Sequence, residues 1–570
     1  MFQSTGLTDL DLSDWDVTKV TTFSYMFLNA SKLTTLNLSN WGVGRTATSV
    51  NMNYIFSGTS ALATLNLTNF KTTNVSNMIY MFQSTGLTSL DLSDWDTTKV
   101  AGFIGMFKNA SKLTELNLSN WGVGSIAVNI NMSYMFQNAS LTELDLSSWD
   151  VTKVKSFSYM FQNANKLTSL NLSGWGISRT VSDVNMSYMF YNTVVLNNLN
   201  LTNFKTTNVT NMSYMFATTG LTSLDLGDWD VTKITAFGTM FASTPNLTTL
   251  NLAGWGEDRT ATNVGMSYMF QHASALTNLN LTNFSTTNVT NMNSMFQGTV
   301  SLTSVDLRNW DVSKVTSFGN MFHSDTNLKI LDLSAWNNVV GANSTSAMFY
   351  NTTNLWKIII GDNFKFGVDP RFTSAPSIGT TITDNGQNYK TTSASWQIVG
   401  NGTDHHPNGD MVTTTEMYAD RSEPVTYVWA QSPTFDGVAN LTFGTLGAGD
   451  FRNGNKPLAT NMATGSVNLI NLESGIPYKV SVVQTSDWTT SGQSATISKN
   501  DLSIQYGDNS LTDSVDFWSG NSTTSQKSIL FNHNTANAFS IWLNPNAVID
   551  TILLGKQLRS ELTWTLSETP

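Results

Sequence analysis

The chain has 570 residues, of which 12% are charged and 40% hydrophobic, and 29 basic against 40 acidic side chains give a formal net charge of -11. The charged fraction is about half of that in ordinary soluble domains, yet 17 tryptophans and 23 methionines exclude a disordered chain. The lack of cysteine excludes disulfide-stabilised domains and thiolate zinc sites, and the acidic balance argues against general nucleic-acid binding.

The first residues lack the basic start and continuous apolar segment of a signal peptide. The tripeptide at residues 1–3 recurs at residues 81–83, inside the chain. We therefore expect the numbering to begin inside a repeat, with an N-terminally truncated first unit and any signal peptide upstream. No apolar run reaches the roughly 18 residues of a membrane helix, so no membrane span is expected.

A repeat with steps of 25–29 residues fills the first two thirds of the chain. The phenylalanine of a recurring pair, usually Met-Phe, falls at Phe2, Phe27, Phe56, Phe82, Phe107, Phe136, Phe161, Phe190, Phe216, Phe241, Phe270, Phe296, Phe322 and Phe349. These positions define thirteen units, and three unit types mostly alternate with a higher period near 80 residues. Self-similarity at this period indicates a solenoid of stacked units.

Each unit is predicted to hold one short strand and one helical turn. Leu36 and Leu38 alternate with polar neighbours, which is the period of a half-buried strand. Met292, Met295 and Phe296 have the i, i+3, i+4 spacing of an apolar stripe on about a turn and a half of helix. Because one such unit cannot bury its apolar side alone, we expect stacked coils whose strands form a parallel sheet.

An aromatic column recurs just after the predicted strands. Its members are Trp15, Trp41, Trp95, Trp121, Trp149, Trp175, Trp229, Trp255, Trp310 and Trp336, with Phe70, Phe204 and Phe284 in the third unit type. Sugar stacking on exposed indoles is one interpretation. A residue in register in every coil is more typical of a continuous core, and we favour the same interpretation for the methionine column.

The units resemble the BspA-like leucine-rich repeats of bacterial surface proteins. Residues 87–107 carry the matching pattern, Leu-Thr-x-Leu-Asp-Leu-Ser-x-Trp-Asp-x-x-Lys-Val-x-x-Phe-x-x-Met-Phe, and residues 355–361 look like a capping coil. The resemblance covers about residues 1–365. It implies a leucine-rich-repeat solenoid over residues 1–366 that serves binding or adhesion rather than catalysis.

The residue between the two strand leucines is always Asp or Asn. The candidate polar face comprises Asp11, Asn37, Asp91, Asn117, Asp145, Asn171, Asp225, Asn251, Asp306 and Asp332, and Asn66, Asn200 and Asn280 occupy the remaining units. One interpretation is a recognition strip for a glycan or a protein, and the other is solubility with side-chain ladder bonding. A calcium ladder is a lesser option, because each ion would need several oxygen ligands.

The repeat stops after residue 366, and the next residues change in character. Residues 367–385 are rich in Gly, Pro, Ser and Thr and are predicted to be a linker. From residue 386 to residue 570, short alternating runs separated by Gly and Asn predict an all-β, sandwich-like domain. The strand-like runs are residues 427–429, 440–443, 467–470, 478–483, 538–543 and 562–566.

The last residues, 562–570, read Leu-Thr-Trp-Thr-Leu-Ser-Glu-Thr-Pro and strongly resemble the terminal motif of WxL domains. Residues 441–444 and 543–545 are also similar to that family. WxL domains attach secreted proteins of low-GC Gram-positive bacteria non-covalently to the cell wall. The resemblance implies peptidoglycan binding by Trp564 and Leu566, and Trp488 is the nearest counterpart of the upstream motif, with Thr490 in place of its leucine. From the residues alone, Trp564 also fits a core position in a terminal strand.

Catalytic motifs are missing from the sequence. His405 and His406 with Asp404 and Asp410 suggest a metal site, but adjacent residues in a Gly- and Asn-rich loop rarely converge on one ion. The sequence has no P-loop, nucleophile elbow or His-Glu-x-x-His pattern. We therefore expect no enzyme activity, no metal and no cofactor.

These features together predict an extracellular, cell-wall-associated binding or adhesion protein. Its solenoid would bind a glycan or protein that the sequence does not identify, and its C-terminal domain would bind peptidoglycan. Nucleic acid is not an expected partner. The alternatives are a polysaccharide-active enzyme on a β-solenoid and a passive surface spacer, and the oligomeric state stays open.

Overall fold

The computed structural model describes residues 1–119, 121–337, 344–447, 449–450, 457–492, 494–533 and 537–569. Contacts divide the chain into two compact units. The first consists of Met1–Thr373 and Thr414–Val425, and the second of Ser374–Thr413 and Thr426–Pro570. Within the described residues, no helix is long and apolar enough to cross a membrane.

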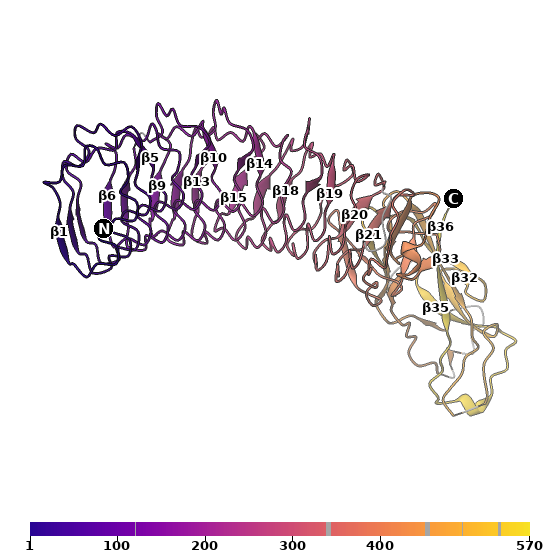
Figure 1. Cartoon of the computed structure of the whole chain (residues 1–570). Coiled ribbons are helices and arrows are strands. Elements are labelled where there is room, and N and C mark those ends of the chain that lie inside the picture. Colours follow the sequence, from indigo (N-terminus) through magenta and orange to yellow (C-terminus); the bar gives the residue numbers. More distant parts are fainter. Residues whose placement is uncertain are drawn as a thin grey trace. The chain divides into compact units, whose positions relative to one another are not determined.

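The first unit is a solenoid whose coils stack one on the next through two columns of short strands (Figure 1). The leucine column consists of β1 (Asp9–Asp11), β2 (Thr35–Asn37), β4 (Thr64–Asn66), β6 (Ser89–Asp91), β7 (Glu115–Asn117), β9 (Glu143–Asp145), β11 (Ser169–Asn171), β13 (Asn198–Asn200), β15 (Ser223–Asp225), β16 (Thr249–Asn251), β18 (Asn278–Asn280), β20 (Ile330–Leu333) and β21 (Lys357–Ile360). The second column consists of β3 (Val50–Asn51), β5 (Val75–Asn77), β8 (Ile130–Asn131), β10 (Val154–Ser156), β12 (Val184–Asn185), β14 (Val209–Asn211), β17 (Val264–Gly265) and β19 (Val289–Asn291).

The predicted parallel pairing of the leucine strands is confirmed. Leu10 of β1 pairs with Leu36 of β2, which pairs with Leu65 of β4, so the same repeat position stays in register. The strands form the parallel groups β1-β2-β4, β6-β7, β9-β11-β13 and β15-β16-β18, and β20 pairs with β21. The groups follow the blocks of unit types in the sequence.

The second strand column was not predicted, and it runs through more coils without a break. Its parallel pairs and single bridges join Thr22, Asn51, Asn77, Gly102, Asn131, Ser156, Asn185, Asn211, Ala236, Gly265, Asn291 and Ser317. Each coil contributes three residues or fewer, too few to give a readable strand period. The expectation of one strand per unit was therefore incomplete.

The predicted helical turn was wrong, since the described residues contain no α-helix. Ser294 and Phe296 donate their backbone N–H groups to the carbonyls of Gly319 and Met321 in the next coil, at 2.8 and 2.9 Å. Helical bonds to the fourth preceding residue therefore cannot form there. Met292, Met295 and Phe296 are nevertheless fully buried, so the apolar spacing correctly predicted which side faces the core.

The tryptophan and phenylalanine columns form the continuous core that we favoured. Trp175 and Trp255 are buried, and their indole Nε1 atoms donate to the carbonyls of Leu146 and Leu226 at 2.9 and 2.8 Å. Phe rings of successive coils stack with centroids 5.2–6.0 Å apart. Trp15 of the first coil is 41% exposed. A buried column of this kind has no free ring face for sugars.

The second unit is built from antiparallel strands, as predicted. Its strands are β22 (Thr381–Asp384), β23 (Gln387–Lys390), β24 (Trp396–Ile398), β25 (Met411–Val412), β26 (Val425–Trp429), β27 (Thr434–Val438), β28 (Ala459–Thr460), β29 (Gly465–Ile470), β30 (Pro477–Gln484), β31 (Leu502–Tyr506), β32 (Asn509–Ser510), β33 (Val515–Asn521), β34 (Gln526–Phe531), β35 (Phe539–Leu543) and β36 (Leu562–Glu568). Short 3-10 helices span Glu416–Tyr418 in the first unit and Thr551–Leu553 in the second. The hairpin strand β22 lies inside the segment that we expected to be a linker.

One apolar core lies among three antiparallel sheets of the second unit. The sheets have the strand orders β27-β29-β34, β28-β35-β31-β32 and β33-β30-β36. Val467, Val480, Leu502 and Phe539 contribute buried side chains from four of these strands. The predicted strand at residues 440–443 is an irregular segment, whose Leu441 and Phe443 still pack against the core.

Candidate functional site

The Asp and Asn side chains of the leucine strands close the turn that follows each strand. The Asp11 carboxylate accepts the Ser13 backbone N–H at 2.9 Å and the Ser13 hydroxyl at 2.7 Å, and Asp145 does the same with Ser147. Such Asx turns end a strand by replacing backbone bonds. The backbone and side-chain bonds from Ser13 hold the pKa of Asp11 below its usual range. One oxygen of these carboxylates is thus already engaged.

Side-chain bonds also connect this column from coil to coil. The Asn251 amide donates to Asp225 at 2.8 Å, and the Asn280 amide donates to Asn251 at 2.8 Å. All ten candidate residues of the polar face are exposed or half-buried: Asp11, Asn37, Asp91, Asn117, Asp145, Asn171, Asp225, Asn251, Asp306 and Asp332. The structure therefore assembles the predicted polar face and its ladder bonds, and ligand recognition by this face stays a prediction.

A ladder of stacked tyrosines, which the sequence reasoning missed, lies on another side of the coils. We call Tyr134, Tyr159, Tyr188 and Tyr214 the tyrosine ladder; successive ring centroids are 4.7, 4.5 and 4.3 Å apart. A shorter run of the same kind consists of Tyr25, Tyr54 and Tyr80, at 4.9 and 5.0 Å. The signal was present in the sequence, since a tyrosine stands two residues before many of the core phenylalanines.

Every tyrosine of these runs has a left-handed backbone. The φ angles lie between 52° at Tyr80 and 61° at Tyr134, a region that costs an ordinary residue roughly 1–2 kcal/mol. Stacking of aromatic rings contributes about 0.5–1.5 kcal/mol per pair. Gly105 and Asn320 occupy the same position of other coils with the same sign of φ, and both residue types adopt it more readily. The fold therefore accepts this position without tyrosine.

The terminal strand β36 points its predicted binding residues toward the core. Leu562, Trp564 and Leu566 are half-buried and pack against the apolar cluster, while Thr563 and Thr565 between them are exposed. The Trp564 ring meets the Phe517 ring edge-on, with centroids 5.0 Å apart. β36 pairs along its length with β30. One face of β36 thus exposes Thr563 and Thr565, and its other face packs Trp564 and Leu566 against the core.

Trp488, the third predicted binding residue, is part of the core. It is 6% exposed, and its indole Nε1 donates to the Leu502 carbonyl at 2.6 Å. Its backbone forms a bridge with Ile497. Direct contact of this side chain with an outside polymer would require it to leave the core.

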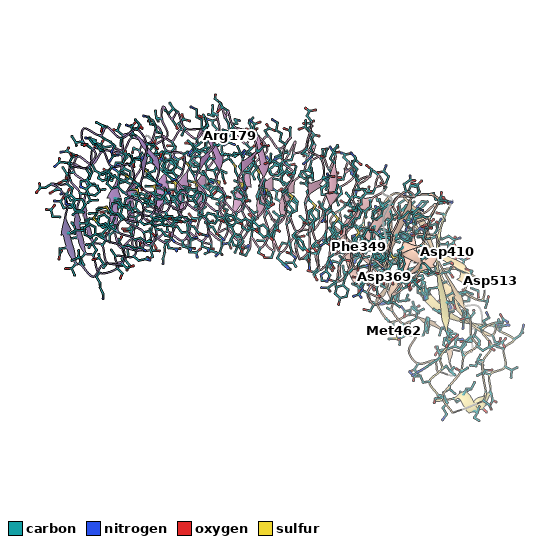
Figure 2. All side chains as sticks on the ribbon, in the orientation of Figure 1. Arg179, Phe349, Asp369, Asp410, Met462 and Asp513 are labelled. Carbon is teal, nitrogen blue, oxygen red and sulfur yellow. The ribbon has the colours of Figure 1, made fainter. Side chains whose placement is uncertain are left out.

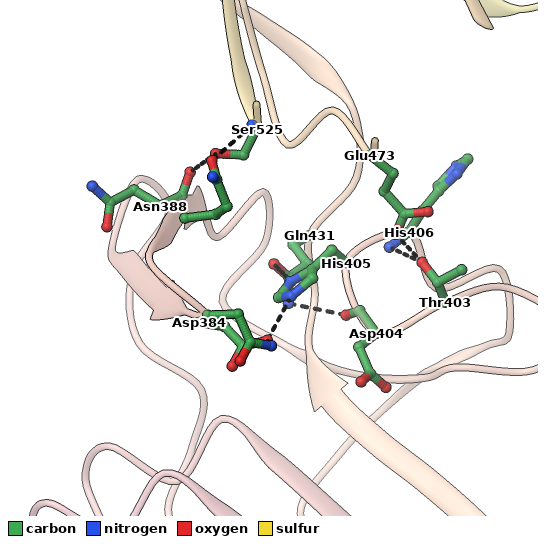
Figure 3. A network of polar contacts seen from close by, with 11 residues as sticks. Asp384, Asn388, Thr403, Asp404, His405, His406, Gln431, Glu473 and Ser525 are labelled. Atoms are coloured by element: carbon green, nitrogen blue, oxygen red, sulfur yellow. Dashed lines mark hydrogen bonds and ion pairs between the residues drawn. The ribbon is translucent and has the colours of Figure 1, made fainter. Parts of the chain in front are cut away.

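His405 is the centre of a polar network in the second unit (Figure 3). Its Nδ1 lies 3.0 Å from Gln431 Oε1 and its Nε2 lies 3.2 Å from an Asp384 carboxylate oxygen. The Gln431 amide nitrogen donates to the Asp404 carbonyl, which fixes the orientation of that amide. The imidazole stacks on the Tyr389 ring with centroids 3.5 Å apart. The network ties the β22–β23 hairpin to β26 and the loop before β25.

The neighbouring His406 contacts Glu568 and takes no part in the His405 network. Its Nδ1 lies 2.7 Å from a Glu568 carboxylate oxygen at the end of β36. Thr403 bonds to Glu473 beside it (Figure 3). The two histidines therefore do not converge on one point, and within the described ranges no three or more His, Asp or Glu side chains are placed to hold a metal ion.

Comparison with known proteins identifies the repeats. The sequence profile of one family matches residues 1–121, 85–185, 171–264 and 264–366, which together span 366 of the 570 residues. The chain belongs to this family, described as Mycoplasma protein of unknown function, DUF285. The match covers the coils of the solenoid. No curated protein matches the chain.

The DUF285 solenoid also buries arginines beneath its longer loops. Arg179 (Figure 2) is 8% exposed, and its guanidinium carbon lies 5.9 Å from the Phe157 ring centroid. One nitrogen donates to the Thr207 carbonyl at 3.3 Å, while Nε and Nη2 have no hydrogen-bond partner. Burial lowers the pKa of Arg179 to about 10. Arg45 and Arg259 repeat this arrangement, and Ser125 stands at the same position of a further DUF285 unit.

Proposed function

We propose that this chain is an extracellular binding or adhesion protein of a bacterial surface. The DUF285 solenoid presents the ligand-binding face, and the second unit attaches the protein non-covalently to peptidoglycan. The resemblance of the coils to BspA-like repeats supports the first part. The resemblance of residues 562–570 to the terminal WxL motif supports the second.

The observation that carries the binding function is the repetition of similar accessible side chains at one-coil spacing. The Asx column, which is the set of Asp and Asn residues on the leucine strands, offers a side-chain oxygen at each coil, and the tyrosine ladder offers a phenol at each of its coils. Many weak contacts in register add up to a high effective affinity for a polymer. A rod that serves as a passive spacer has no need of tyrosines that stack from coil to coil.

An enzyme that cleaves polysaccharides is less well supported. Glycoside hydrolysis generally uses two carboxyl groups about 5–10 Å apart on either side of the scissile bond. The carboxylates of Asp91 and Asp145 accept bonds from Ser93 and Ser147 of their own turns. These bonds favour the ionised form of both groups and leave neither as a proton donor.

The attachment to the wall is assigned to the outward side of β36. Thr563 and Thr565 are exposed there, with the Thr563 hydroxyl donating to Thr485 Oγ1 at 3.2 Å, and Trp564 and Leu566 pack against the core. A flat row of hydroxyl groups suits the sugar and amide groups of peptidoglycan. Trp564 then acts on binding by positioning the strand.

Sedimentation of the full chain with purified Gram-positive peptidoglycan tests the attachment. We expect the chain to pellet with the walls, and we expect Thr563→Val with Thr565→Val to weaken pelleting about tenfold while the fold is kept. Thr383→Val with Thr460→Val, on exposed strand positions of two other sheets of the second unit, is the matched control. A full chain that stays in the supernatant contradicts the attachment.

A further inference from the structure

We infer that the tyrosine ladder, Tyr134, Tyr159, Tyr188 and Tyr214, binds an uncharged linear polysaccharide. The inference rests on the proposed binding function of the solenoid and names both the surface and the ligand class. It concerns a different side of the coils from the Asx column.

The first step is that the fold does not explain the tyrosines. Their position in the coil is left-handed, and glycine or asparagine meets that requirement with less strain. Other coils of this chain do so with Gly105 and Asn320. The ring centroids of its three pairs lie 4.7, 4.5 and 4.3 Å apart, so the stack runs unbroken over four coils. Thr239, Ser294 and Ala347 hold the same backbone position with φ angles of 61°, 54° and 51°. The left-handed turn thus belongs to the coil, and the unbroken ring stack is what singles out the tyrosines.

The second step is that the ladder is already ordered before a ligand arrives. Each inner ring has a neighbouring ring on both faces, so its side chain has little rotamer freedom left to lose. All four tyrosines are half-buried, so part of each side chain is accessible to solvent. In the described part of the chain, the phenol oxygens of Tyr134 and Tyr159 have no protein hydrogen-bond partner. Ordered tyrosines with free hydroxyls bind at a low entropy cost.

The third step concerns charge. Each ladder tyrosine follows a serine, and Ser133 and Ser158 bond to each other at 2.9 Å. Gln137 and Gln162 border the ladder on the other side and bond side chain to side chain. Burial and the neighbouring tyrosines raise the pKa of Tyr188 to about 12, so this phenol is uncharged at neutral pH.

The side chains that border the ladder, such as Ser133, Ser158, Gln137 and Gln162, carry hydroxyl and amide groups. Lys108 supplies a cation at one end, where its Nζ lies 5.1 Å from the Tyr134 ring centroid. A polyanion or polycation would meet few opposite charges along the remaining coils, and an uncharged ligand loses nothing by their absence.

The fourth step separates a sugar chain from a peptide strand. The backbone N–H groups of Tyr134, Tyr159 and Tyr188 donate to carbonyls of the next coil at 2.9–3.0 Å. Strand addition needs an open row of such groups, and the ladder has none to offer. A folded protein partner usually meets an apolar centre with a polar rim, whereas the ladder is a narrow row of rings that widens only where Tyr191 packs edge-on against Tyr188 and Tyr214. A polysaccharide carries hydroxyl groups on each sugar unit. It can bind through side chains alone and needs no free backbone N–H groups.

Affinity electrophoresis of the full chain tests the inference. The gels contain soluble mixed-linkage β-glucan, dextran or galactomannan as neutral probes, and polygalacturonate as the anionic probe. The test variant is Tyr159→Asn with Tyr188→Asn, because Asn320 shows that asparagine fits this backbone position. The matched control is Tyr268→Asn, which changes a tyrosine of the same register outside the ladder.

We expect at least one neutral polysaccharide to retard the wild-type chain and the double variant to bind it at least about tenfold more weakly. The control should change binding by less than about twofold, and circular dichroism should show equal folding of all three proteins. Equal retardation of wild type and double variant overturns the inference. So does retardation by polygalacturonate alone, or a dimer that dissociates in the double variant, because a second copy would then cover the ladder.

Peptidoglycan sedimentation of the same proteins keeps this inference apart from the proposed attachment. The double variant should pellet with walls as well as the wild type does, since β36 is unchanged. Pelleting without polysaccharide binding overturns the inference alone. Polysaccharide binding without pelleting overturns the wall attachment alone.

Discussion

The Asp325 carboxyl accepts two hydrogen bonds from Thr299 of the preceding coil, from the backbone N–H at 2.8 Å and from the hydroxyl at 3.0 Å. Asp325 is 2% exposed and stands where other coils carry a buried threonine, such as Thr244 and Thr352. Those threonines bond to the carbonyl three residues earlier in their own coil. One DUF285 unit thus places an acid where its neighbours place a hydroxyl.

This acid makes the thermal stability of the solenoid depend on pH. Burial raises the pKa of Asp325 well above its usual range, and the bonds from Thr299 offset that only in part. From about 3.9, the pKa of an unfolded aspartate, up to the raised folded pKa, the unfolded chain binds fewer protons than the folded chain. Stability therefore falls as pH rises through this window. Melting temperatures across pH 4–8 should show that fall relative to Asp325→Thr, and a pH-independent difference between the two proteins contradicts it.

Replacing the acid with the residue of the neighbouring coils should stabilise the protein at neutral pH. Asp325→Thr removes a buried ionisable group and restores the bond to the carbonyl of Phe322 that Thr352 makes to Phe349. Thr299 keeps a backbone partner, because its N–H also lies 3.0 Å from the Phe296 carbonyl. We expect a gain of about 1–3 kcal/mol at pH 8. An equal or lower melting temperature in calorimetry refutes the assignment of Asp325 as a destabilising group.

The aliphatic part of the Arg179 side chain should contribute more to the free energy of unfolding than its charged guanidinium does. Arg179→Met keeps apolar contact with Phe157 and removes two nitrogen atoms that have no hydrogen-bond partner, so we expect a change within about 1 kcal/mol of zero or a small gain. Arg179→Ser, which copies Ser125, should lower the melting temperature because it leaves a cavity. Equal losses in both variants point instead to a necessary guanidinium.

The indole hydrogen bond of Trp255 should add to the free energy of unfolding beyond what the packing of its ring contributes. Trp255→Phe copies Phe284 of a neighbouring unit, but it removes the 2.8 Å indole donor of the Leu226 carbonyl, which then keeps the Trp229 backbone N–H at 3.1 Å. We expect a loss of about 2–4 kcal/mol from the lost bond together with the smaller ring. Chemical denaturation followed by tryptophan fluorescence measures the shift, with Phe284→Leu as a size control. A wild-type midpoint in Trp255→Phe refutes the role of the bond.

The features of the fold that repeat in sequence were predictable. The alternation at Leu36 and Leu38 located the leucine strands, and the period placed tryptophans such as Trp175 in one buried column. The helical turn at residues 289–296 was mistaken because Met292, Met295 and Phe296 show helical spacing while their coil bonds to its neighbour. Bonds between coils leave no local trace in the sequence.

The candidate site was predictable in part for a similar reason. The Asx column follows from strand alternation, whereas the tyrosine ladder depends on a left-handed position whose occupants in other coils, such as Gly105, Thr239 and Asn320, share no residue type. A motif also does not reveal which way a side chain faces. Trp488 was selected by its neighbours in sequence, and its indole lies in the core with a bond to Leu502.

The central claim is that one chain holds a cell wall through its second unit and a polysaccharide through its solenoid. Purified peptidoglycan loaded with the full chain, washed and then incubated with fluorescent mixed-linkage β-glucan, dextran or galactomannan measures both at once. We predict that the pelleted walls retain at least one of the three polysaccharides when loaded with the wild-type chain, and that walls loaded with the Tyr159→Asn, Tyr188→Asn variant do not. Walls that carry the wild-type chain and retain no more of any polysaccharide than bare walls contradict the account.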